Sequence, residues 1–247
     1  MDYKLGKTPA RKNSASFRLR DYLSLAILPV PPVSGGHFEL ADDGQMFGND
    51  TIGCCTCADV GHATLLWNRE ADKQVNISTE NVLALYSAVT GYNGDPSTDT
   101  GADMSDVAKY HRRVGLSDES GKYHKIVAYM AVTPGNTEEL KQSIYLFGAC
   151  SIGWGLPLSA QEQTEEGEPW SIVNRSPIVG GHDTLAVGYD QKYIYVVTWG
   201  QLQKVTYPFF AKFMDEGLVK LSLEMLENGK SMEGFNATQL QKDLGAL

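Results

Sequence analysis

The sequence lacks a segment that could cross a membrane and a recognisable export signal. Its longest apolar run near the N-terminus, residues 23–33, is short and is broken by three prolines. Basic residues are scattered over the twenty positions before this run, but no small-residue cleavage site accompanies them. We therefore expect no signal peptide, no membrane partner, and a cytoplasmic or virion location.

Cysteine is scarce, with four residues in a chain of 247. Cys54 and Cys55 are adjacent, Cys57 follows closely, and Cys150 stands alone in an apolar stretch, which is a poor framework for disulfides. Free thiols in a reducing compartment are the expectation. The three clustered cysteines with His62 or Cys150 could bind zinc, but no second Cys-x-x-Cys pair is present. We therefore predict no metal and no cofactor.

Basic residues are few beyond the N-terminal segment. Residues 1–20 hold six basic residues against one acidic residue, a net charge of +5, whereas the rest holds 15 basic against 29 acidic residues, a net charge of −14. The acidic body excludes a nucleic-acid partner, because it would repel phosphates and has no basic patch with interleaved aromatic residues. We interpret the basic segment as a solvated tail, with an arm that docks on neighbouring protein subunits as the alternative.

With 42% hydrophobic residues, the chain can bury a core as one domain or two tightly packed lobes. Helical periodicity dominates the first half and strand patterns the second, which predicts an α+β fold. We divide the chain into an extended basic, proline-rich arm that packs on a body rather than forming one (1–34), a main domain (35–207) and a C-terminal helical extension packed on it (208–247). The expected helices are 54–67, 79–90, 103–114, 136–147, 208–214 and 236–244; the expected strands are 125–132, 149–154, 182–189, 193–199 and 203–207; and an acidic surface loop is expected between Pro157 and Pro169.

Residues 48–62 carry the strongest chemical signal. Here a glycine-punctuated loop leads into an apolar-periodic helix, and a helix N-terminus lowers the pKa of a thiol placed there. Cys55 is preferred as the nucleophile because it follows Gly53 by two positions and has an amide side chain, Asn49, six residues before it. Cys57, with Thr51 six residues before it, is the alternative.

These residues resemble the papain-like cysteine peptidase superfamily. The family places an amide residue six positions before the cysteine that opens its central helix, as Asn49 and Cys55 do here. Its His-Ala-Val-x-x-Val-Gly-Tyr strand is similar to residues 182–189, and its Asn-Ser-Trp-Gly motif is similar to residues 197–200. The layout also looks like uncharacterised papain-like proteins of bacteria and phages. The resemblance implies a helical lobe, with the nucleophile helix at its centre, packed against an antiparallel sheet lobe.

The resemblance also implies roles for individual residues. Cys55 would be the nucleophile, His182 its base and later acid, and Asn49 a donor to the oxyanion. The family's imidazole-orienting Asn is replaced here by Val197. Thr198, Asp183 or Asp190 would then have to orient His182, and a missing third member lowers the rate rather than abolishing it. The other four histidines, His37, His62, His111 and His124, are interpreted as structural.

Two functions remain open from the sequence. The first is a papain-fold cysteine hydrolase, a peptidase or amidase that acts on a peptide or amide substrate with a Cys–His pair weakened by the loss of Asn. The second is a catalytically weak or inactive papain-fold component of a phage particle or another multi-chain assembly. The distance between Cys55 and His182 is the feature expected to separate them.

Overall fold

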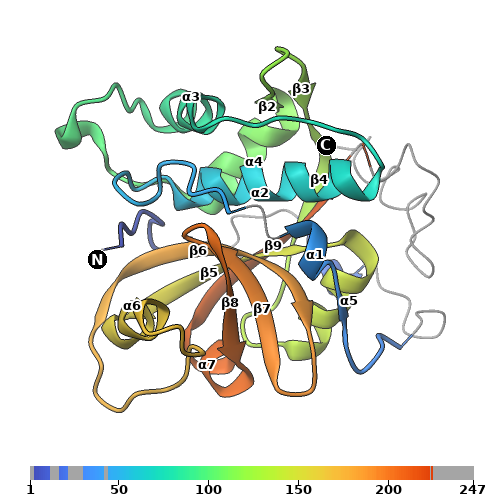
Figure 1. The fold of residues 1–247 in the computed structure, drawn as a ribbon, viewed down its shortest axis with the longest axis vertical. Helices are drawn as coiled ribbons and strands as arrows, with labels where there is room; N and C mark the ends of the chain where they lie inside the picture. Colours follow the sequence, from blue (N-terminus) through green and yellow to red (C-terminus); the bar gives the residue numbers. More distant parts are fainter. Residues whose placement is uncertain (1–2, 12–16, 22–29, 42–43, 223, 225–247) are drawn as a thin grey trace.

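The computed structural model describes residues 3–11, 17–21, 30–41, 44–222 and 224 of the chain. Two lobes form it: a layer of helices and an antiparallel sheet with its own helices (Figure 1). This is the α+β arrangement of a helical lobe and an antiparallel sheet lobe that the sequence predicts. No helix in the described ranges has the length and apolar character needed to cross a membrane.

Three helices build the helical lobe: α2 (Cys55–Glu70), α3 (Thr79–Thr90) and α4 (Met104–Arg113). Their predicted positions are confirmed, because the signals that begin each helix are local. Ser78 and Asn81 form a reciprocal capping box on α3, and the Asp103 carboxylate accepts from two backbone N–H groups at the start of α4. All but one residue of α2 is buried, which makes it the central helix of the lobe.

A seven-stranded antiparallel sheet forms the other lobe, with the strand order β4-β9-β5-β6-β7-β8 and the short β1 paired with β6. The strands are β1 (Gly35–Gly36), β4 (Ile126–Ala131), β5 (Cys150–Pro157), β6 (Ile178–Tyr189), β7 (Tyr193–Thr198), β8 (Gln201–Thr206) and β9 (Met214–Ser222). The helices α5 (Thr137–Phe147), α6 (Leu158–Glu165) and α7 (Tyr207–Phe213) accompany it. The smaller elements are η1 (Leu19–Asp21), α1 (Phe38–Ala41), η2 (Pro96–Thr98) and the β2 (Leu116–Ser117) and β3 (Tyr123–His124) pair.

Two sequence expectations are wrong. The acidic stretch after Pro157 is not a loop throughout, because Leu158–Glu165 is the helix α6, with Pro157 as its N-cap. The C-terminal segment is not a helical extension throughout: the expected helix 208–214 is present as α7, but Met214–Ser222 is β9, which lies between β4 and β5 inside the sheet. Its partners are distant in sequence, so local patterning does not reveal it. The expected helix 236–244 lies outside the described residues.

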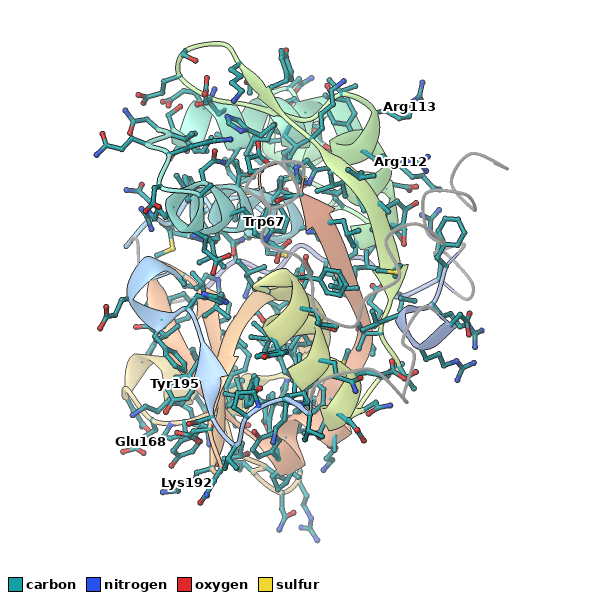
Figure 2. The ribbon with its side chains drawn as sticks, turned by 90° about the vertical axis from the view of Figure 1, so that its right-hand side faces the viewer. Trp67, Arg112, Arg113, Glu168, Lys192 and Tyr195 are labelled. Atoms are coloured by element: carbon teal, nitrogen blue, oxygen red, sulfur yellow. The ribbon has the colours of Figure 1, made fainter. Side chains whose placement is uncertain are left out.

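The lobes meet along α2, which packs against β6. Trp67 lies at this junction, near the centre of the molecule in Figure 2, and its indole N–H donates to the Phe147 carbonyl at 3.1 Å. Arg112 and Arg113 lie at the helical end of that view, whereas Lys192 and Tyr195 lie at the sheet end. A shared apolar cluster that includes Leu66, Trp67, Leu185 and Val187 joins the two lobes.

Candidate active site

Cys55 is the first residue of α2 and faces the sheet lobe. Its side chain is almost fully buried, and burial, with the charge of Asp183 adding to it, raises the pKa of the thiol to about 12. The backbone amides of Asp183, Gly6 and Thr56 act in the opposite direction and lower the pKa of the thiol. The thiol is therefore neutral in this conformation, although it stands at a helix N-terminus and among amide donors.

His182 lies on β6, where it pairs across the sheet with Trp154 on β5. Its Nε2 atom is 2.7 Å from the Thr198 hydroxyl oxygen, and its Nδ1 atom has no hydrogen-bond partner in the described part of the chain. The ring stacks on Trp199 with centroids 4.2 Å apart. Burial lowers the pKa of His182 to about 3, so the imidazole is neutral here.

Thr198 lies where a third catalytic residue would orient the imidazole of His182. Of the three candidates for orienting His182, Thr198 makes the hydrogen bond, whereas Asp190 instead accepts from Tyr195 and from two backbone N–H groups of the β6–β7 turn. Asp183 follows His182 in β6, so its side chain points to the opposite face of the strand. Val197, at the position of the family's Asn, pairs with Leu185 in the sheet.

Cys55 shares a small cavity with Asp183, the residue directly after His182, and with Thr198, which holds His182. The backbone amide of Asp183 acts to lower the pKa of the Cys55 thiol. No Cys55–His182 hydrogen bond is present among the described contacts, and the free Nδ1 atom of His182 is the one not held by Thr198. The thiol and the imidazole therefore lie in one region of the molecule without a direct hydrogen bond.

Asn49 reaches the same site. It is buried beside Cys55 in the lining of a small cavity, and its side-chain amide donates to the Ile52 carbonyl at 3.1 Å and to the Lys4 carbonyl at 3.5 Å. The amide predicted to serve an oxyanion is therefore engaged mainly by the Ile52 carbonyl of its own loop, with a longer contact to the N-terminal segment. Asn49, Cys55 and Thr198 line the same cavity, and Thr198 holds His182.

The segment Tyr3–Thr8, named here the cleft segment, passes between the two lobes near the chain's N-terminus (Figure 1), and its Gly6 lies next to Cys55. Its main chain bonds both sides: the Lys7 N–H donates to the Gly181 carbonyl at 3.0 Å, and the Ala102 N–H donates to the Gly6 carbonyl at 2.8 Å. Tyr3 stacks on Trp199 with ring centroids 4.3 Å apart. The cleft segment, Trp199 and His182 therefore form one continuous packed unit that covers the thiol.

The expectation of a solvated basic tail is wrong for residues 3–11, because this part of the chain binds the protein's own acidic body. Arg11 makes two short hydrogen bonds to the Asp103 carboxylate, and Lys7 makes ion pairs with Asp215 and Glu216. The opposite charges of tail and body, visible in the sequence, are the signal that could have predicted this docking.

The other three cysteines are core residues, whereas His62 lies close to Cys55. Cys54 and Cys57 belong to the core of the helical lobe and Cys150 to that of the sheet lobe, and all four cysteines are free thiols. Cys57 is therefore not placed as a nucleophile. His62 lines the small cavity beside Cys55, and His111 stacks on Trp67.

Two of the histidines interpreted as structural pair with carboxylates, partners that the sequence analysis did not name. His37 contacts Glu70, and His124 lies between Asp118 and Glu224, with nitrogen–oxygen distances of 3.1 and 2.8 Å. Burial acts to lower the pKa of His124, but hydrogen bonds to both carboxylates outweigh it and raise the pKa.

A buried charge cluster lies beside the nucleophile and was also missed. Lys220 of β9 contacts the Asp59 carboxylate of α2, which also accepts from the Ser151 hydroxyl at 2.8 Å. Burial, with the charge of Asp59 adding to it, raises the pKa of Asp183 well above its usual range. A lysine inside the apolar run of residues 217–221 is the sequence signal for a buried partner.

Comparison with known proteins identifies the fold. The structure superimposes on xylellain, a cysteine protease from Xylella fastidiosa, with a TM-score of 0.70 at 16% identity over 90% of this chain and 97% of that chain. It is similar to procathepsin B from Trypanosoma congolense (TM-score 0.62, 11% identity, 89% and 86% covered). Procathepsin L 3 from Tenebrio molitor gives a TM-score of 0.61 at 13% identity, with 89% and 76% covered.

These proteins define the class of fold: the chain has the fold of papain-like cysteine proteases. No family model matches the sequence, and no curated protein matches it significantly. At 11–16% identity the likeness establishes the fold alone, so the activity of this chain has to be argued from its own site.

Proposed function

We propose that the protein is a cysteine hydrolase that cleaves peptide or amide bonds, with Cys55 as nucleophile and His182 as base and then acid. Asn49 and the backbone N–H of Cys55 would donate to the oxyanion, and Thr198 would orient the imidazole. The observation that carries the proposal is the state of His182: one nitrogen is held by Thr198, and the other is unpartnered beside the segment that contacts the thiol.

The reaction requires the cleft segment to leave. In its presence Cys55 is a neutral thiol and His182 a neutral imidazole, because both are shut off from water. Displacement would admit water and substrate, bring both pKa values toward their ordinary range, and allow the thiol proton to pass to Nδ1 of His182. The thiolate would then attack the carbonyl carbon, and the imidazolium would return the proton to the leaving amine.

The test is thiol-dependent turnover of a mixed fluorogenic peptide and amide library by the full chain carrying Gly6→Val, which displaces the cleft segment because a Cβ atom there would lie 1.8 Å from the Gly53 carbonyl oxygen. The matched variants are Cys55→Ser and Cys57→Ser, since both thiols are buried and only Cys55 faces the cleft. Turnover that Cys55→Ser abolishes and Cys57→Ser retains supports the proposal. Turnover that survives Cys55→Ser contradicts the assignment.

A second function has an observation in its favour. The occupied cleft and the neutral thiol are also what a non-catalytic component of a multi-chain assembly, such as a phage particle, would show. In that case a Cys55→Ala/His182→Ala variant would assemble normally, and opening the cleft would produce neither turnover nor a reactive thiol.

A further inference from the structure

Lys7 of the cleft segment inserts its side chain into a pocket of the sheet lobe. The side chain is fully buried, and its ammonium nitrogen lies 3.0 Å from the Asp215 carboxylate and 2.9 Å from the Glu216 carboxylate. Burial acts to lower the pKa of Lys7, but the attraction of Glu216 and Asp215 outweighs it and raises the pKa. The pocket therefore holds a charged lysine.

The pocket is shaped for a long aliphatic stem. Gly153 of β5 forms its wall, because a Cβ atom at Gly153 would lie 2.2 Å from Cε of Lys7. The same Cβ atom would lie 2.8 Å from both Met104 and Glu216 side-chain atoms. Any other residue at position 153 would close the space that the lysine stem fills.

The pocket adjoins the nucleophile. Lys7 directly follows Gly6, whose backbone amide acts to lower the pKa of the Cys55 thiol. The Lys7 main chain bonds to Gly181, which precedes His182, and forms a parallel bridge with Ala102 of the helical lobe. An extended peptide that crosses the cleft would use the same main-chain groups and would present a side chain to this pocket.

The two carboxylates determine which side chain is accepted. Glu216 is 11% exposed and Asp215 is 36% exposed, so the pair is partly shielded from water and salt. An aliphatic side chain would leave Glu216 desolvated without a counter-charge, and an acidic one would be repelled. Lysine and arginine place a cation on a flexible apolar stem and satisfy both requirements.

We propose that Asp215, Glu216 and Gly153 form a specificity pocket that selects peptides with a lysine or arginine side chain, and that Lys7 is its internal occupant. The inference rests on the proposed function for its meaning in catalysis. It names the substrate class of that function, peptides with a basic residue next to the bond-cleaving thiol.

The first experiment measures binding without catalysis. The probe is the blocked peptide of residues 3–9, Tyr-Lys-Leu-Gly-Lys-Thr-Pro, with its second lysine kept or replaced by norleucine or glutamate. It is titrated by calorimetry into the full chain carrying Gly6→Val, which displaces the cleft segment, and Cys55→Ser. We expect the lysine peptide to bind about tenfold or more tightly than the norleucine peptide, and Glu216→Gln to remove that difference. Equal binding of the three peptides, or no binding of any, overturns the inference.

The second experiment tests Lys7 of the protein's own cleft segment and requires no added peptide. Alkylation of Cys55 by iodoacetamide is followed by mass spectrometry in Lys7→Arg and Lys7→Met chains. Arginine should keep the thiol protected within about twofold of the parent chain, whereas methionine, which matches the apolar stem of lysine but lacks the cation, should raise the rate at least about tenfold. Equal rates for the two variants contradict the pocket.

The binding and turnover measurements together distinguish the hydrolase proposal from the pocket proposal. Charge-selective binding without turnover by the chain with Cys55 intact would refute the hydrolase and leave the pocket standing. Turnover with no preference between lysine and norleucine peptides would support the hydrolase and refute the pocket.

Discussion

Gly6→Val should convert Cys55 from a protected thiol into a reactive one. A Cβ atom at Gly6 would lie 1.8 Å from the Gly53 carbonyl oxygen, and backbone cannot yield as a flexible side chain can. Gly53 is itself held by the Asp99 carboxylate. The cleft segment therefore has to move away from the thiol, while the body of the protein keeps its contacts.

The size of the effect follows from the pKa of Cys55. With a pKa of about 12 in the closed site, a fraction of roughly 10⁻⁴·⁵ is thiolate at pH 7.5, whereas an exposed thiol near ~8.5 is about 10% thiolate. The thiolate fraction thus rises by a factor of ~10³·⁵, but each thiolate becomes less reactive by a factor of ~10¹·⁶, because thiolate nucleophilicity falls as the pKa falls. Alkylation of Cys55 should therefore accelerate about 100-fold, before easier access is added.

The assay is the rate of carbamidomethylation at Cys55, read by peptide mass spectrometry at pH 7.5. Ala10→Val is the matched control, since it also adds methyl groups to residues 3–11 but at an exposed position, and it should react like the parent chain. Cys57 and Cys150, buried in the two cores, should stay unmodified in both variants. A Gly6→Val rate within threefold of the parent would refute the idea that the cleft segment controls the thiol.

Three further results are expected. Thr198→Val should lower kcat about 10- to 100-fold with little change in KM, because the imidazole of His182 loses its orienting hydrogen bond, and Thr198→Ser should restore most of it; an unchanged kcat would contradict this role. Lys220→Met should lower the free energy of unfolding by about 3–5 kcal/mol, since it leaves the buried Asp59 carboxylate unpaired, and Lys220→Met/Asp59→Leu should recover much of it in urea titrations. The pairing of His124 with Asp118 and Glu224 should contribute less to the free energy of unfolding as pH rises through the folded pKa of His124, which lies above its unfolded value. In a chain carrying His124→Gln, the urea midpoint should therefore depend less on pH between pH 6 and 9.

Most of the helical lobe follows from local signals. Ser78 and Asn81 begin α3 and Asp103 begins α4 through hydrogen bonds within a few residues, so the sequence alone predicts these boundaries. The strand β9 was not predicted, because it depends on long-range pairing rather than on local signals. It is stabilised by pairing with β4 and β5, more than fifty residues away, and its apolar residues fit a helix as well as a strand.

The candidate site divides in the same way. The spacing of Asn49 and Cys55, and the order of His182 and Trp199 after them, are properties of the chain, and they are the basis for predicting Cys55 and His182 as a pair. The partner of His182 could not be chosen among Thr198, Asp183 and Asp190 without the strand geometry, because alternation along β6 and β7 decides which side chains share a face.

The sequence by itself thus determined which thiol and which imidazole could work together, because a helix start and a strand motif are local patterns. Only the tertiary structure decided what covers them. The cleft segment closes the site through contacts with residues between 99 and 216. Its Lys7 forms ion pairs with Asp215 and Glu216, which lie more than two hundred residues later in the sequence. Charge composition indicated that a basic segment and an acidic body attract each other, but the pocket that receives Lys7 exists only once β5 and β9 are paired.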